Sequence, residues 1–263
     1  MIIQHIIQHL KELVHYRNLI WILAWADFKQ RYKNSVLGYL WSLLEPLLML
    51  SILYIVFSNL MKVQVEYYQL FLLQGIIMWS FFSRATTMCL TSIVMKPHLI
   101  QKVYFPRDIL VISACITALL MSIFESIVLF LFLIIFQIPL SVNLIFIPLI
   151  VLLFFFMALG VSLALAALNV YFRDIQYIWA LILQAGFFAT PIIYPLSVFP
   201  SLLFRILSYN PLAQIVYLGR DVTIYAKEPN LASLSYTIAI AFLALCIGYW
   251  IFMRLEPRFA EEV

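Results

Sequence analysis

Three ionisable side chains lie inside apolar stretches, where a charge is costly and can do chemistry. Glu45 and Arg84 lie at matching depths in the first two stretches, and Glu125 lies near the middle of the third. Because a charge buried in lipid is usually paired, we expect a contact between Glu45 and Arg84. The alternatives are that each snorkels separately to water, or that Glu45 is protonated. Glu125 suggests a proton relay, but no second deep carboxylate or histidine follows, which favours a packing or cavity-facing role.

Other chemistries have little support in the sequence. The six glycines are widely separated, so neither a phosphate-binding loop nor a dinucleotide fingerprint can be written. Cys89, Cys115 and Cys246 are isolated residues in apolar runs, which argues against disulfides and a zinc site. We expect no catalytic residue, no metal and no cofactor in this chain. The sequence has no basic stripe with interleaved aromatic residues, so we expect no nucleic-acid partner.

The composition indicates a protein that lives in lipid. Of the 263 residues, 65% are hydrophobic and 11% are charged, whereas soluble domains are roughly half apolar and one quarter charged. A helix needs about 20 mostly apolar residues to cross the hydrocarbon core. We therefore predict an all-α integral membrane protein, a single transmembrane domain over residues 1–263 with six transmembrane helices. The predicted spans are residues 36–61, 70–92, 109–138, 144–171, 177–194 and 231–253.

The basic residues predict the orientation. Of the 16 lysines and arginines, eleven fall on the predicted face that holds both termini and four on the other face. Because cytoplasmic loops carry the excess of lysine and arginine, both termini are expected in the cytoplasm of a multi-pass plasma or inner membrane protein.

Three apolar segments are not predicted to be simple membrane spans. In residues 17–34 the aromatic residues recur at helical spacing and basic residues occupy the other arc, which predicts an interfacial amphipathic helix in contact with membrane lipids. A short extra span or a plain anchor is the alternative. This helix is represented by Trp21, Trp25, Phe28, Lys29, Arg31 and Tyr32.

The second segment, residues 97–105, is bracketed by Pro97 and Pro106, which favours about two turns of separate helix. It is too apolar for a free loop, so one face should be buried against the membrane or another protein. The third, residues 195–230, holds apolar runs too short to cross, which predicts short amphipathic or re-entrant helices.

Several strings together resemble the membrane subunit of ABC transporters that export polysaccharides, the branch serving O-antigen, capsule and teichoic acid. They extend in order over nearly the whole chain. They are Asp27-Phe-Lys-Gln-Arg-Tyr32 with Leu37-Gly-Tyr-Leu-Trp-Ser-Leu-Leu-Glu-Pro46, Lys102-Val-Tyr-Phe-Pro-Arg-Asp108, Asn169-Val-Tyr-Phe-Arg-Asp-Ile175, and Thr190-Pro-Ile-Ile-Tyr-Pro195 followed by Asn210-Pro-Leu212.

The resemblance implies a homodimeric channel driven by two copies of a separate cytoplasmic ATPase, which binds the ATP and magnesium. It assigns residues 97–105 as the coupling helix, and the interfacial helix and the Arg173–Asp174 turn as secondary contacts. Residues 195–230 would form the outer gate. The coupling residues are His98, Leu99, Ile100, Gln101, Lys102, Val103, Tyr104, Phe105, Arg173 and Asp174.

The resemblance implies a lipid-linked polysaccharide as the substrate, of the O-antigen type. Aromatic rings can stack on the apolar faces of sugars, although most aromatics in a membrane protein pack or anchor. The candidate path residues are Trp41, Phe187, Phe188, Tyr194 and Tyr209. The alternatives are a permease of the same architecture for teichoic acid, capsule, small drugs or lipids, an integral-membrane lipid-modifying enzyme, or a secondary transporter.

Overall fold

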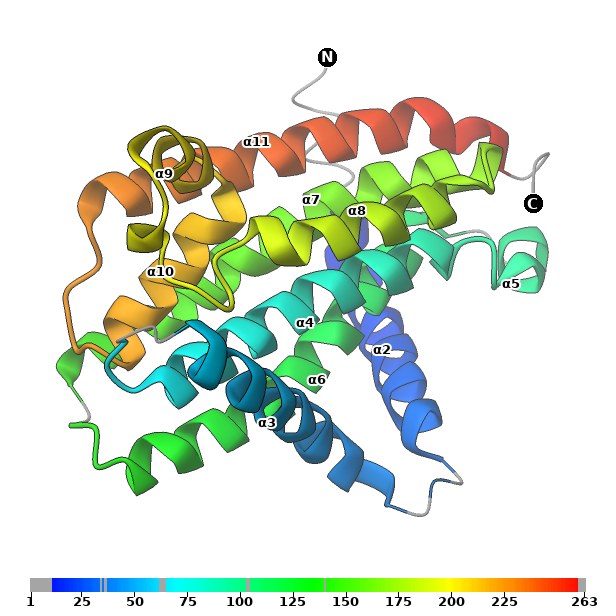
Figure 1. The fold of residues 1–263 in the computed structure, drawn as a ribbon. Helices are drawn as coiled ribbons and strands as arrows, with labels where there is room; N and C mark the ends of the chain where they lie inside the picture. The colour runs from blue at the N-terminus through cyan, green and yellow to red at the C-terminus, as the bar shows by residue number, and fades with distance from the viewer. Residues whose placement is uncertain are drawn as a thin grey trace.

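The computed structural model describes residues 11–33, 35, 37–61, 65–102, 105–139 and 141–259, and within these ranges the secondary structure is entirely helical. Most of the long helices run roughly side by side, and the helix labelled α3 is inclined to them (Figure 1). The α-helices are α2 (Arg17–Tyr32), α3 (Trp41–Met61), α4 (Tyr68–Ser92), α5 (Pro97–Lys102), α6 (Asp108–Ile135), α7 (Ile147–Tyr171), α8 (Ile175–Ala189), α9 (Ser201–Ser208), α10 (Pro211–Thr223) and α11 (Leu231–Leu255). Short 3-10 helices cover Gly38–Leu40, Val142–Phe146, Leu196–Val198 and Glu256–Arg258.

Four helical segments among the described residues are long and apolar enough to cross a membrane. They are Gly38–Ser58, Asp108–Ile135, Val142–Tyr171 and Leu231–Arg258. The 25-residue helix α4 is as long but more polar, because it carries side chains such as Gln74 and Arg84. Most of its residues are buried by other helices, so it needs less apolar surface facing lipid. The chain is therefore an all-α, multi-pass membrane protein.

The fifth predicted span is shorter than the sequence suggested. The apolar helix α8 ends at Ala189 rather than continuing to residue 194. Pro191 follows it, and proline both lacks an amide donor and disfavours the helical conformation of the residue before it. Residues 190–195 instead bend away and lead into the short helices that precede α11.

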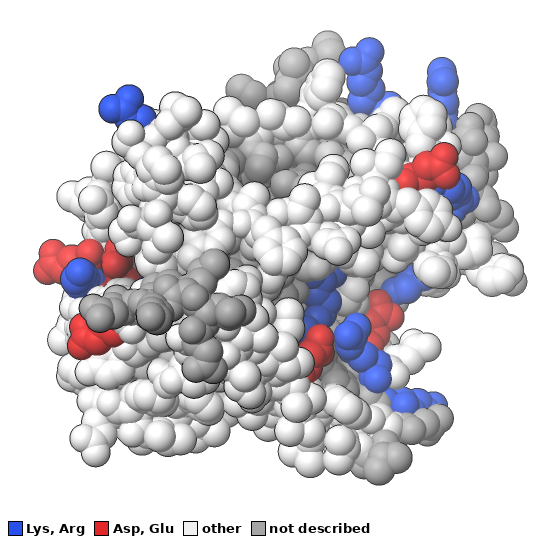
Figure 2. Space-filling view, viewed as in Figure 1, with Lys and Arg blue, Asp and Glu red and all other residues white. Residues whose placement is uncertain are grey.

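The two ends of the bundle carry different elements. The helix α5, the turn between α7 and α8 and the last turns of α11 lie at one end, and α9 and α10 lie at the other (Figure 1). The helix α2 crosses the long helices at a steep angle near the α5 end. Charged side chains gather near both ends and in one notch, whereas the rest of the visible face is almost free of them (Figure 2).

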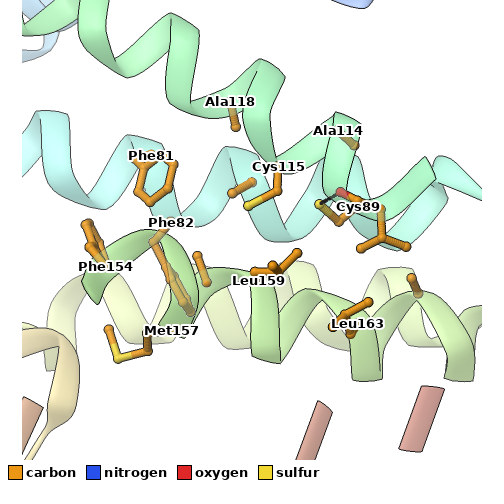
Figure 3. Packing of buried hydrophobic residues seen from close by; sticks show 14 of the residues in the cluster. Phe81, Phe82, Cys89, Ala114, Cys115, Ala118, Phe154, Met157, Leu159 and Leu163 are labelled. Carbon is orange, nitrogen blue, oxygen red and sulfur yellow. Dashed lines mark hydrogen bonds between the residues drawn. The ribbon is translucent and has the colours of Figure 1, made fainter. Parts of the chain in front are cut away.

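The centre of the bundle is packed by α4, α6 and α7 (Figure 3). Phe81 of α4 lies edge-on to Phe154 of α7, with ring centroids 5.0 Å apart. The buried thiol of Cys89 donates to the Val111 carbonyl at 3.2 Å, so it uses a backbone oxygen of α6 as its acceptor. Cys89 and Cys115 are buried free thiols, and Cys246 is an exposed one.

The helices α7 and α11 approach to backbone contact at two glycines. A Cβ atom added to Gly248 would lie 1.8 Å from the carbonyl oxygen of Gly160. A Cβ atom added to Gly160 would lie 2.4 Å from the backbone of Ala244. Small residues at membrane helix crossings allow such close approach, where dispersion contacts replace the missing hydrophobic driving force.

We expect Gly248→Ala to lower the free energy of unfolding by about 2 kcal/mol or more, because the new methyl meets backbone that no side-chain rotation can move aside. The thermal unfolding temperature of the detergent-purified protein is the measurement. Ala239→Leu, at an exposed position of the same helix, is the matched control and should change it little. Equal stability of Gly248→Ala and the wild type would contradict the packing described here.

Candidate functional site

The three intramembrane charges meet at one point. Arg84 of α4 lies 2.6 Å from Oε1 of Glu125 on α6 and 3.7 Å from Oε2 of Glu45 on α3. The expected contact between Glu45 and Arg84 is therefore present, but the nearer carboxylate is Glu125. A single guanidinium thus links three helices, and the cluster carries one negative charge more than positive when both acids are ionised.

The two carboxylates of this cluster differ strongly in environment. The Glu125 side chain is 1% exposed, whereas that of Glu45 is 60% exposed. One oxygen of Glu125, Oε2, has no hydrogen-bond partner among the described residues. Glu125 therefore serves as the buried anchor of Arg84, while Glu45 keeps a largely free carboxylate.

A cavity of about 600 Å³ adjoins this cluster between α3, α4 and α6. Glu45 and Glu125 line it, together with Trp41 on α3 and Ser80 on α4. Arg31, at the end of α2, also lines the cavity. The helix α2 and the charge cluster thus border the same space.

The aromatic residues of α2 face two different environments. Trp21 and Trp25 are exposed and stack with ring centroids 6.2 Å apart, and Lys29 lies 5.5 Å from the Trp25 ring. Phe28 is instead buried against Phe124 of α6, with centroids 5.3 Å apart. The expectation that the whole stripe faces the membrane interface is therefore wrong for Phe28, which anchors the helix to the bundle.

Polar contacts also hold α2 in place. Thr117 of α6 donates its hydroxyl to the Ala24 carbonyl at 3.1 Å. The Lys96 ammonium, just beyond α4, lies 2.7 Å from Oδ2 of Asp27. Arg31 is exposed, and the side chain of Tyr32 lies outside the described residues. The helix is thus fixed both to the bundle and to the segment that precedes α5.

The predicted coupling segment forms a short helix, α5, that ends at Lys102 rather than at residue 105. His98 is exposed and Leu99 is half-buried against the core. Val103 and Tyr104 lie outside the described residues, as do the side chains of Ile100, Gln101 and Lys102.

Phe105 does not belong to the exposed face that was expected for coupling. This side chain is buried in the core of the bundle, so it cannot itself contact a partner and instead anchors the end of the segment. Met95, just before α5, is 74% exposed and has no sequence pattern that distinguishes it from its apolar neighbours. Arg173 and Asp174 are exposed in the turn between α7 and α8, at the same end of the bundle as α5 (Figure 1).

The opposite end is held by a fully buried arginine. The Arg220 guanidinium on α10 donates to the carbonyls of Pro191 at 2.7 Å, Phe71 at 2.9 Å and Ile192 at 3.1 Å. It also lies 3.4 Å from the centroid of the Phe71 ring. Burial lowers the pKa of Arg220 to about 10, so it remains a cation at neutral pH. Arg220 therefore clamps the bend after α8 to the first turn of α4.

Small and polar residues of α4 make room for this clamp. A Cβ atom on Gly75 would lie 2.6 Å from Nη2 of Arg220, so only glycine leaves the guanidinium its place. One turn along α10, the Thr223 hydroxyl donates to Oε1 of Gln74 at 2.7 Å. The sequence holds a pattern that indicates the burial of Arg220, because this residue shares a helical face with the apolar residues Ala213 and Val216.

The five aromatic path candidates do not gather in one place. Trp41 lines the cavity beside the charge cluster. Phe187 and Phe188 line a separate cavity of about 400 Å³ between α4 and α8, with Trp79. The Tyr194 hydroxyl donates to the Phe188 carbonyl. The exposed residue Tyr209 belongs to neither lining and accepts a hydrogen bond at its carbonyl from Tyr236 at 2.6 Å.

Comparison with known families assigns this architecture. Residues 18–224 match the ABC-2 type transporter family. The chain belongs to this family. It is accordingly the membrane subunit of an ABC transporter, and ATP hydrolysis resides in a separate partner subunit.

Three relatives align with this ABC-2 transporter subunit over most of their length. The O-antigen export system permease protein RfbA of Klebsiella pneumoniae is 32% identical over 245 residues, covering 93% of this chain and 94% of that protein. The protein of the same name from Myxococcus xanthus is 29% identical and covers 98% of this chain and all of its own. The polysialic acid transport protein KpsM of Escherichia coli is 25% identical and covers 88% and 90%.

The geometry of the charge cluster predicts that its two glutamates contribute unequally to stability. We expect Glu125→Gln to lower the free energy of unfolding by about 3 kcal/mol, because it leaves a buried guanidinium without its close anion. Glu45→Gln should cost about 1 kcal/mol or less, since this carboxylate is exposed and more distant. Thermal unfolding of the purified variants, completed as double-mutant cycles with Arg84→Gln, measures both couplings. Equal coupling energies for the two pairs would contradict this assignment.

The clamp predicts that Arg220→Lys cannot replace the wild-type residue. One ammonium cannot reach three carbonyls with the geometry of a guanidinium, so the loss should exceed about 2 kcal/mol. Gly75→Ala should destabilise as well, by displacing Nη2. Thermal unfolding is again the measurement, with Arg205→Lys on the exposed helix α9 as the matched control. A wild-type unfolding temperature for Arg220→Lys would refute the clamp.

Proposed function

We propose that this chain forms the membrane channel of an ATP-driven exporter that moves a lipid-linked polysaccharide of the O-antigen type out of the cytoplasm. The observation that carries the proposal is the likeness to O-antigen export permeases of two organisms over nearly the full length of both proteins. The likeness to a polysialic acid transport protein supports a second candidate substrate, an acidic capsule polysaccharide.

The proposed subunit has six membrane spans, formed by α3, α4, α6, α7, α8 and α11. The helix α4 is counted with the four long apolar helices because most of its residues are covered by neighbours. The helix α8 is counted as a short span continued by the bend after residue 189. Both termini then lie on the cytoplasmic side, in agreement with the excess of basic residues there. Two copies of the chain would enclose the channel.

We place the docking surface for the ATPase at the end that carries α5 and the Arg173–Asp174 turn. Met95 is exposed just before this helix and His98 is exposed within it, while Ile93 and Phe105 on either side are buried. A short segment anchored at both ends with exposed side chains between can transmit a push from a partner to α4 and α6. The helices α9 and α10 would then form the gate at the outer end.

The decisive experiment is co-purification followed by an ATPase assay. The tagged chain is co-expressed with a candidate ATP-binding subunit from the same source, purified, and reconstituted in liposomes. Hydrolysis of ATP is then measured with and without the lipid-linked glycan extracted from source cells that lack this permease. We expect a stable complex whose hydrolysis is stimulated by the glycan. No association with the ATPase, or no stimulation, would refute the proposed function.

A variant of the same complex tests the docking surface. Met95→Glu should reduce the ATPase retained on the purified permease by about tenfold or more, since a charge buried without a partner costs more than the 1.4 kcal/mol this represents. Val142→Glu, a strongly exposed apolar position at the other end of the bundle, is the matched control. Undiminished retention by Met95→Glu would place the docking surface elsewhere.

A further inference from the structure

The cavity beside the charge cluster has the form of a binding site rather than of a packing gap. Its α3 wall is one broad helix face. Trp41, Glu45, Leu48 and Ile52 recur there at helical spacing, and the neighbouring residues Ser42, Pro46 and Met49 also line the cavity. Ser80 of α4 and Glu125 of α6 close the other sides. The volume of about 600 Å³ lies within the range of sites that hold small organic ligands.

A buried and incompletely satisfied acceptor lines this cavity. Glu125 gives Oε1 to Arg84, but Oε2 has no hydrogen-bond partner among the described residues although the side chain is 1% exposed. Leaving a buried carboxylate oxygen without a donor is costly. A ligand that donates a hydrogen bond inside the cavity would remove that cost.

Glu45 supplies a second acceptor one helical turn from Trp41. Its carboxylate is 60% exposed and is 3.7 Å from Arg84, too far for a direct hydrogen bond. The Glu45 carboxylate thus lies near Arg84 but can still accept hydrogen bonds from another group. Trp41 is 46% exposed on the same helix face, so an aromatic side chain and two acidic acceptors line one cavity.

These features together fit a sugar ring. A sugar carries several hydroxyl donors around its edge and an apolar face of C–H groups, which matches two carboxylate acceptors and one exposed aromatic face. Two carboxylates disfavour a phosphate, although Arg31 on the described lining offers one positive charge. A purely apolar ligand would leave the oxygen of Glu125 unsatisfied.

We propose that this cavity binds a sugar residue of the exported glycan, with Trp41 stacking on the ring and Glu45 and Glu125 accepting hydrogen bonds from its hydroxyls. Arg84 positions both carboxylates. The cavity borders the end of α2, so the sugar would be held in the half of the membrane next to the ATPase end. The proposal rests on the proposed function and adds to it a defined contact site for the substrate.

The test uses the complete permease–ATPase complex in liposomes and the lipid-linked glycan extracted from source cells that lack the permease. The measured quantity is the glycan concentration that gives half-maximal stimulation of ATP hydrolysis. Trp41→Ala and Glu45→Gln should each raise it by about fivefold or more, the effect of one lost contact. Trp41→Phe keeps a stacking face and should restore most of the affinity. Size-exclusion chromatography shows that each variant is folded and assembled.

Two substitutions of the same kind outside the cavity are the controls. Trp250→Ala removes an exposed tryptophan of α11, and Glu66→Gln neutralises an exposed acid before α4. Neither should change the half-maximal concentration. Wild-type values for both Trp41→Ala and Glu45→Gln would overturn the sugar site while leaving the exporter intact. A wild-type complex that the glycan does not stimulate would refute the proposed function, and the sugar site with it.

Discussion

An arginine inside an apolar bundle must have its charge paired, and the arrangement of three helices depends on this constraint. Arg84 is held by Glu125 at 2.6 Å and by Glu45 at 3.7 Å, so α3, α4 and α6 meet at one cation. Removing such ions from water costs several kcal/mol each. The attraction between the paired charges offsets this cost but adds little net stability. What the cluster adds is therefore specificity, because a shift of any of these helices along its axis would separate charges that lipid cannot solvate.

The second buried arginine solves the same problem by other means. Arg220 uses backbone carbonyls of Phe71, Pro191 and Ile192 in place of carboxylates. The carbonyls of Pro191 and Ile192 lie in the bend after α8, outside any helix. Non-helical backbone at membrane depth is tolerated where protein groups satisfy it. One arginine is thus surrounded by acids that border a cavity, whereas the other closes a bend with its own hydrogen bonds.

The helix α4 connects the two ends of this transporter subunit. Its first turn supplies the Phe71 carbonyl to Arg220, its middle carries Arg84, and its last turn leads within five residues to α5. Its buried residues include the polar side chains of Gln74, Thr86 and Ser92. A helix with fixed contacts at both ends would provide a direct physical link between the proposed docking surface for the ATPase and the proposed gate at the far end.

The amino-acid sequence by itself determined the class of protein, the approximate ends of the long helices, the separate helix α5 and the depth match of Glu45 and Arg84. These follow from local properties: hydrophobic length, proline positions and the cost of buried charge. The tertiary structure alone decided that Glu125 is the closer partner of Arg84, that Phe28 and Phe105 are buried, and that Trp41 and Phe187 line different cavities. Each of these depends on which helices pack together, and contacts between residues far apart in the chain leave no local pattern.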